Sequence, residues 1–198
     1  MANSVVIGLP GALPEVVSYE TLDAKGDVGY LEGQLAKGDH VHPRNELGFA
    51  HAKIPAQSGS TSLPNNNNKP TTANGTQIFS KTLTLESADN VIHITGIMQG
   101  EVDGNGGDYG GLGVAVFRGS TCIGGGAAFY NTKDPGEGFG PLGFNIVDAP
   151  GTVGPHTYTV RVGTVNGTTW YVGRTRSVRW NGAMSDGSNV TLMEMSLI

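Results

Sequence analysis

The sequence predicts an all-β protein whose C-terminal part is an antiparallel, jelly-roll-like sandwich. Glycine supplies 32 of the 198 residues and charged residues only 15%, a composition that favours strands and tight turns over helices. Short segments in which polar and apolar residues alternate recur between clusters of glycine, proline, asparagine and aspartate. No stretch combines a helical period with helix caps, so the prediction is strands throughout the C-terminal part.

The composition divides the chain into three parts. Residues 1–43 are interrupted by prolines and glycines, and we expect them to order by packing on copies of themselves or on a partner. A short helix over 19–35 would be broken by three glycines. Residues 44–75 are rich in proline, asparagine and serine, which predicts an extended, weakly ordered linker. Residues 76–198 form the predicted sandwich head.

The expected strands of the head share a period of two and end at turn-forming residues. They cover about 81–86, 91–98, 112–118, 121–130, 144–147, 156–165, 169–172, 177–180 and 189–198. Because the last of them continues to the final residue, we expect the C-terminus to be paired within a sheet and intolerant of trimming.

Charge and cysteine content exclude several classes of protein. The formal net charge is −5 and no run of lysine and arginine occurs, which argues against binding to nucleic acid. No apolar run is long enough to insert into a membrane, and the N-terminus lacks the basic region of a signal peptide, so we expect synthesis in a cytoplasm without export. The single cysteine, Cys122, allows no disulfide within the chain and is expected to be an inert, buried thiol.

Residues 38–43 read Gly-Asp-His-Val-His-Pro and stand at a boundary in composition. This element resembles one that recurs in fibre and spike proteins of tailed bacteriophages and phage-like particles, at the junction between an anchor and the next module. The head is similar to the trimeric jelly-roll tips of such fibres, whose shape is that of C1q and tumour-necrosis-factor heads, and residues 190–197 look like their closing strand. The resemblance implies a homotrimer in the virion, made in the cytoplasm of a bacterial host. Its residues 1–43 would attach to other virion proteins, and its head would bind a host cell-surface saccharide during adsorption.

The two histidines of this motif are candidate metal ligands. Some phage fibres bind iron through successive His-X-His pairs on a three-fold axis, whereas this chain has a single pair. His40 and His42 point to the same side of an extended strand, so three chains would bring six imidazoles together, enough for an octahedral Fe, Ni or Zn ion. The alternative is that Asp39 and both histidines form hydrogen bonds across the junction.

Two glycine-rich segments have alternative interpretations. Asp103, Asn105 and Asp108 offer oxygen ligands, but their spacing fails the EF-hand pattern, so a hairpin loop with solvated acids is predicted and calcium is not expected. Gly124–Gly126 interrupt a strand, which indicates either the close approach of another backbone, from a neighbouring subunit in a trimer, or a β-bulge.

Scarce charge favours a neutral saccharide as the ligand, because sugar rings stack on aromatic faces and their hydroxyls bond to polar edges. Tyr109 and Phe139 lie in glycine-rich loops and are the first candidates for ligand contact. Tyr130, Trp170 and Arg174 are further candidates, although the alternation around Trp170 favours a core position over a ligand contact.

The sequence contains no nucleophile elbow, phosphate loop, metalloprotease helix or cysteine pair, so we expect no enzymatic activity. A glycosidase whose two carboxylates meet only in the folded chain is the enzymatic alternative. Two non-enzymatic functions also remain open at this point. One is a structural capsid-decorating or base-plate component without receptor binding. The other is a lectin-like carbohydrate-binding module unrelated to phage.

Overall fold

The computed structural model describes residues 48–103, 109–131, 139–175 and 186–196, together with the backbone of two strands nearer the N-terminus. The chain forms two compact units, Met1–Asn45 and Glu46–Ile198. In the first unit, β1 (Ser4–Ile7) and β2 (Glu15–Ser18) pair as antiparallel strands. The helix considered over 19–35 lies outside the described residues.

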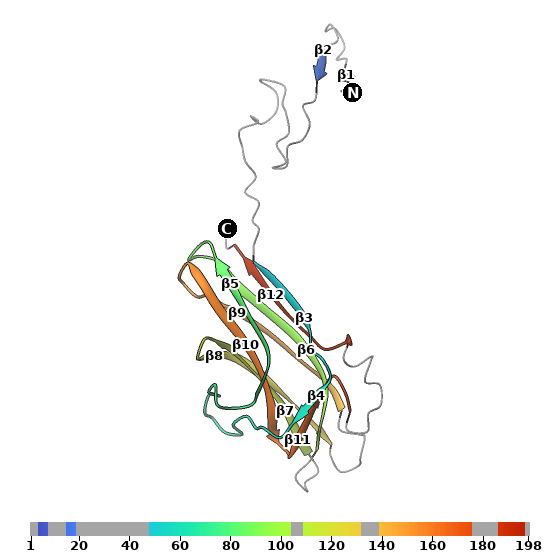
Figure 1. Ribbon diagram of the computed structural model, residues 1–198, viewed down its shortest axis with the longest axis vertical. Coiled ribbons are helices and arrows are strands. Elements are labelled where there is room, and N and C mark those ends of the chain that lie inside the picture. The colour runs from blue at the N-terminus through green and yellow to red at the C-terminus, as the bar shows by residue number, and fades with distance from the viewer. Residues whose placement is uncertain are drawn as a thin grey trace. The chain divides into compact units, whose positions relative to one another are not determined.

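The second unit contains two antiparallel sheets (Figure 1). The first sheet comprises β3 (Phe49–Lys53), β4 (Gln57–Gly59), β6 (Val91–Asp103), β9 (Phe139–Asp148), β11 (Thr169–Val172) and β12 (Asn189–Met195). β9 pairs with one edge of the long strand β6, while β12 and β11 pair with successive stretches of its other edge. β3 and β4 then pair with β12 and β11, respectively, so the first sheet is effectively four strands wide.

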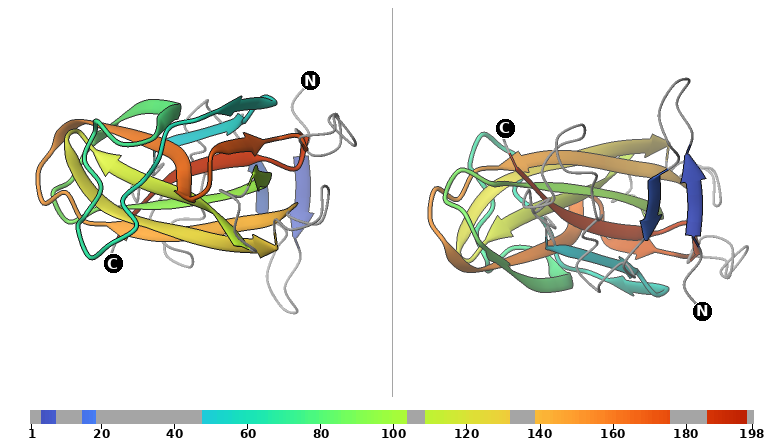
Figure 2. Two further views of the ribbon diagram at one scale, coloured as in Figure 1. Left: turned by 90° about the horizontal axis from the view of Figure 1, so that it is seen from below. Right: turned by 90° about the horizontal axis from the view of Figure 1, so that it is seen from above.

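The second sheet has the order β5-β10-β7-β8. Its strands are β5 (Thr76–Leu85), β7 (Tyr109–Arg118), β8 (Thr121–Asn131) and β10 (Gly154–Asn166). The two sheets pack face to face, which confirms the predicted all-β sandwich (Figure 2). The predicted strand over 177–180 lies outside the described residues.

The core lies between the sheets and follows the predicted alternation. Ile92 and Ile94 of β6 are completely buried, as are Tyr158, Val160 and Val162 of β10. Their intervening neighbours face outward or are only partly buried. Burial of these alternate side chains fixes the register of the long strands, since a slip by one residue would turn every apolar side chain toward water.

The last strand is held by a buried carboxylate. Glu194 of β12 is 1% exposed, and its Oε2 accepts a hydrogen bond from the backbone N–H of Gly48 at 2.9 Å. Its Oε1 accepts another from the Asn90 amide at 2.6 Å, and its own N–H donates to the Gly48 carbonyl. A buried charge needs such partners, so Glu194 ties the C-terminal strand to the start of β3.

The expectation of a weakly ordered linker is wrong for residues 48–75. β3 and β4 belong to the first sheet, and residues 60–75, here called the strap, lie on the outer side of the second sheet (Figure 1, the teal segment between β4 and β5). Leu63 is only 6% exposed and packs with Ala115 and Phe117 in a second, smaller core. The linker prediction failed because the strap gains its order from the sheet beneath it rather than from a pattern of its own.

Backbone hydrogen bonds fasten the strap to β10. The N–H of Leu63 donates to the carbonyl of Thr164, whose own N–H donates to the carbonyl of Thr61, both at 2.9 Å. Further along, the Arg161 guanidinium donates to the carbonyls of Asn74 and Gly75 at 2.7 and 2.8 Å. These bonds satisfy backbone groups that a buried, irregular segment would otherwise leave unpaired.

Two glycines make this close approach possible. A Cβ atom at Gly163 would lie 3.0 Å from the carbonyl oxygen of Thr61 and the carbonyl carbon of Ser62. One at Gly113 would lie 2.9 Å from Leu63 Cδ1. The absence of side chains at these two outward positions therefore lets the strap rest on the sheet.

Gly124–Gly126 of β8 also lie where neighbouring strands approach closely. A Cβ atom at Gly124 would lie 2.7 Å from Ile146 Cδ1 of β9, and one at Gly125 would collide with the Val114 carbonyl of β7. The register of β7 and β8 also shifts between Val116 and Phe117, as at a β-bulge. Both the close approach and the irregularity therefore occur within one chain.

Replacing Leu63 by alanine should destabilise the protein by about 2–3 kcal/mol, because it removes buried methyl groups from the small core under the strap. Urea unfolding monitored by tryptophan fluorescence would measure this change. Val153→Ala is the matched control, since Val153 is 63% exposed. If Leu63→Ala lowers the free energy of unfolding no more than Val153→Ala does, the strap is not packed on the sheet.

Candidate ligand-binding face

The middle of the outward side of β7 and β8 carries only glycine and alanine. Leu112 and Val114 point into the core, so the alternate residues of β7 face outward beneath the strap. The outward residues and their partners pair as Gly111 with Phe129, Gly113 with Ala127, and Ala115 with Gly125. We call this surface, together with Tyr109 at the start of β7, the β7–β8 face.

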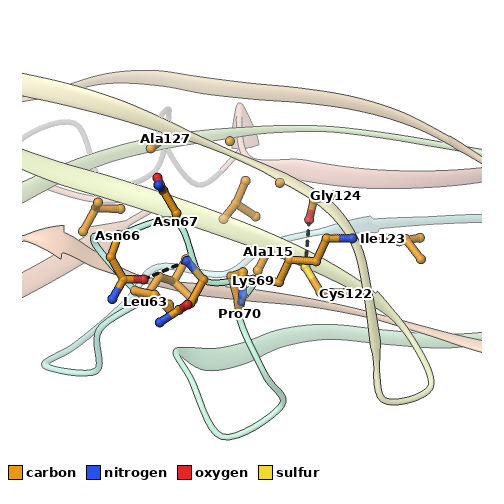
Figure 3. Close-up of a pocket in the computed structure, with 16 residues that line it drawn as sticks. Leu63, Asn66, Asn67, Lys69, Pro70, Ala115, Cys122, Ile123, Gly124 and Ala127 are labelled. Carbon is orange, nitrogen blue, oxygen red and sulfur yellow. Dashed lines mark hydrogen bonds between the residues drawn. The ribbon is translucent and has the colours of Figure 1, made fainter.

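A cavity of about 400 Å³ opens on this face, between the strap and β8 (Figure 3). Its walls include Leu63 and Val165, and its floor includes Ala115 and the backbone of Gly124–Gly126. Three consecutive asparagines of the strap contribute to the lining, as does Lys69. We call this cavity the strap pocket.

The polar groups of the strap pocket are mostly neutral. The asparagine side chains each offer an amide that can both donate and accept hydrogen bonds. Lys69 is the one charged residue of the lining, which contains no carboxylate. The strap pocket thus combines small apolar surfaces with amides, the pattern of a site for a compact, polar and mainly uncharged molecule.

Two exposed aromatic rings extend the same face beyond the pocket. Tyr109 is 63% exposed and Phe129 is 56% exposed. Because Tyr109 pairs with Asn131 and Phe129 pairs with Gly111, the two rings are diagonal neighbours on adjacent strands. Sequence reasoning identified Tyr109 but missed Phe129, which shares the outward parity of Gly125 and Ala127 in β8.

Phe139 and Tyr130 lie close to the same end of the sandwich. Phe139, the first residue of β9, is 51% exposed. Tyr130 is partly buried, and its hydroxyl donates to the Gly140 carbonyl at 3.2 Å. Burial raises the pKa of Tyr130 to about 12, so its hydroxyl stays protonated and holds β8 to β9. Phe139 therefore offers the more accessible ring.

The structure places two other predicted ligand residues away from this face. Trp170 is 1% exposed in the core, and its indole N–H donates to the Thr61 hydroxyl at 3.2 Å, so the prediction that it contacts a ligand is wrong. The large ring fills the space between the sheets and leaves no surface for a sugar. Arg174 follows β11 of the first sheet and stacks over the Tyr171 ring at 5.6 Å.

Buried charge occurs near the opposite end of β7, where Asp148 terminates β9. Both Asp148 oxygens accept hydrogen bonds from Arg118 Nη1, at 2.9 and 3.1 Å, and Oδ2 accepts a third from the Tyr158 hydroxyl at 2.8 Å. Burial, reinforced by the bond to Asp148, raises the pKa of Tyr158 above its ordinary value. Arg118 and Tyr158 thus satisfy the Asp148 carboxylate, and the three side chains join β7, β9 and β10.

The predicted metal ligands His40 and His42 lie outside the described residues, as do Asn105 and Asp108 of the acidic loop. Asp103 is described, and its carboxylate accepts a hydrogen bond from the Tyr171 hydroxyl at 3.1 Å. Within the described ranges, no group of three or more histidine, cysteine, aspartate or glutamate side chains could hold a metal ion. The same part of the chain contains no helix long and apolar enough to cross a membrane.

Comparison with known proteins gives structural likenesses alone. No family model and no curated protein matches the sequence. A chain of infectious bursal disease virus strain Gx is similar with a TM-score of 0.41 and 11% identity, over 99% of this chain and 37% of that one. The VP2 subviral particle of the same virus gives 0.38 and 10%, over 97% and 42%. The insecticidal δ-endotoxin Cry8Ea1 of Bacillus thuringiensis gives 0.34 and 13%, over 64% and 19%. The present chain thus spans less than half the length of these proteins.

Tyr130 and Tyr158 predict a loss of stability in alkali. Their folded-state pKa values exceed the ordinary value of 10.0, so the native protein keeps protons that the unfolded chain releases. Stability should be intact below about pH 10 and should then fall by up to about 1.4 kcal/mol per pH unit for each tyrosine. Tyr130→Phe and Tyr158→Phe should each reduce this slope in urea unfolding at several pH values, whereas Tyr109→Phe is the control. Unchanged slopes in both variants would contradict the assignment.

Proposed function

We propose that this chain is a fibre or spike protein of a tailed bacteriophage or phage-like particle, and that its head binds a host cell-surface saccharide. The observation that carries the proposal is the β7–β8 face, where the exposed rings of Tyr109 and Phe129 lie beyond a cavity lined by amides. Aromatic faces stack on sugar rings, while amides match the donors and acceptors of sugar hydroxyls. Phe139 adds a third exposed ring near one end of this face.

The organisation of the chain supports the same function. The sheet orders β5-β10-β7-β8 and β3-β12-β6-β9 agree with a jelly roll of eight strands, with β4 and β11 as short extensions. The first unit, Met1–Asn45, is a compact unit of its own and its sequence contains the Asp-His-Val-His-Pro motif. In our proposal this unit attaches to other virion proteins, and the head faces the host.

We further propose that three copies associate through the outer side of the first sheet. Strand register places Phe49, Met193, His93 and Val147 side by side in one row across β3, β12, β6 and β9. Phe49 and Val147 are 63% and 64% exposed, and Met193 is 40% exposed. A row with exposed apolar side chains and no carboxylate, lysine or arginine suits association between identical subunits. Three heads would multiply weak saccharide contacts into stable attachment.

Alanine substitution of Tyr109 and Phe129 should weaken attachment of the full chain to host cells by about tenfold for each ring, since each supplies a stacking surface. Fluorescently labelled protein on candidate host cells, and on their extracted surface polysaccharides, would measure the loss. Val153→Ala controls for the removal of an exposed apolar side chain. Undiminished attachment of the double variant would contradict saccharide binding at this face, and a trimer without any such attachment would favour a structural virion component.

Light scattering on a gel-filtration column should give a native mass near three times 20.5 kDa. Met193→Asp should dissociate the assembly because it buries an unpaired charge in the row, whereas Val153→Asp should leave the mass unchanged. A monomeric wild-type chain would overturn the proposed trimer.

Metal analysis of the same chromatographic peak tests the Asp-His-Val-His-Pro motif. If His40 and His42 are ligands, the peak should contain one Fe, Ni or Zn ion per trimer. A His40→Ala variant should lose that ion.

A further inference from the structure

The strap pocket and the aromatic rings differ in what they can recognise. The rings of Tyr109 and Phe129 are open surfaces that accept many sugars. The pocket is a cavity of about 400 Å³, which falls within the size range of sites for small ligands. It can therefore discriminate between sugar substituents by shape and by hydrogen bonds, which an open ring cannot do.

The polar side of the pocket has side chains available for a ligand. Asn66 Oδ1 accepts the backbone N–H of Asn68 at 2.9 Å, which fixes this turn of the strap. Asn67 and Lys69 have no hydrogen bond or ion pair with another part of the described chain. The Asn67 amide can consequently donate to and accept from a ligand without breaking an internal bond.

The apolar side of the pocket is small and made of methyl-sized surfaces. Ala115 is 1% exposed, and Leu63 and Val165 pack against it. Glycines of β8 add backbone without side chains. Val165 is partly exposed and Ala127 is exposed, so a methyl group would fit against these two side chains. The lining has no carboxylate, and only Lys69 could attract an anion.

We propose that the strap pocket is a subsite for a neutral sugar that carries an acetamido group. The acetamido N–H and C=O match the asparagine amides, and its methyl group matches the accessible apolar surface at Ala127 and Val165. This inference rests on the proposed saccharide-binding function and assigns one part of that saccharide. The rest of the chain of sugars would continue over Phe129 and Tyr109.

The test uses the full-length chain with N-acetylglucosamine and N-acetylgalactosamine, each compared with the parent sugars glucose and galactose. Binding is followed by ligand-detected NMR and by alkylation of Cys122. Cys122 is the only cysteine of the chain, is partly buried and lines the pocket, so its rate of alkylation reports occupancy. The acetamido sugars should slow alkylation severalfold at saturation, and the parent sugars should not.

Matched variants locate the binding. Asn67→Ala should weaken binding of the acetamido sugars by about threefold to tenfold, the usual loss of affinity for one hydrogen bond. Asn65→Ala, in the same asparagine run but outside the lining, should have no effect. Ala127→Leu should fill the pocket and abolish both binding and protection, whereas Ala149→Leu, at an exposed position outside it, should not. Thermal melting of each variant checks that it is folded.

The binding experiments and the cell-attachment experiments test the subsite and the proposed function separately. Equal binding of acetamido and parent sugars, or binding unaffected by Ala127→Leu, would overturn the subsite. A preference for sialic or hexuronic acid that Lys69→Met removes would also overturn it in favour of an anionic sugar. If the pocket variants fail to alter attachment to host cells while Tyr109→Ala reduces it, the subsite fails and the proposed function stands. If neither class of variant matters, the proposed function fails as well.

Discussion

The contact between the strap and the outer side of the second sheet, at Gly113 and Gly163, shapes the face that we propose binds a saccharide. Gly113 and Gly163 leave space that Leu63 and the Thr61 backbone fill. The strap then covers Ala115 and Phe117 and forms one wall of the pocket. A side chain at either glycine would push the strap outward and open that wall. Glycine destabilises a strand, so its presence at these two positions is explained by the close approach of the strap that it permits.

The two sheets of the sandwich have different outer surfaces, and this difference divides the proposed tasks between them. The first sheet presents a row of Phe49, Met193, His93 and Val147, which suits association with like subunits. The second presents small residues, amides and aromatic rings, which suit a sugar. Between them, the core and the buried carboxylates of Glu194 and Asp148 hold the strands in register. Assembly and recognition therefore need not compete for the same surface.

Alternation in the sequence was sufficient to predict most strands because burial on one face of a sheet imposes a period of two. The Leu83 and Leu85 positions of β5 are an example, and both are buried. The strap could not be predicted this way, since its order comes from Thr164, Arg161 and Gly163, which are far away in the sequence. The same limit applies to the candidate site. Local glycine content identified Tyr109 and Phe139, but recognising Phe129 required the pairing of β8 with β7.

The most direct measurement of the central claim is a residue-by-residue NMR titration of the isotopically labelled full chain with the surface saccharide of a host that it recognises. Saccharide binding at the proposed site should change chemical shifts mainly on the β7–β8 face, at Tyr109, Phe129 and the strap asparagines 66–68. Because the outer side of the first sheet is assigned to assembly, Phe49 and Met193 should change little. Chemical-shift changes confined to that side, with none at the strap or at the two rings, would show that the β7–β8 face does not bind the saccharide.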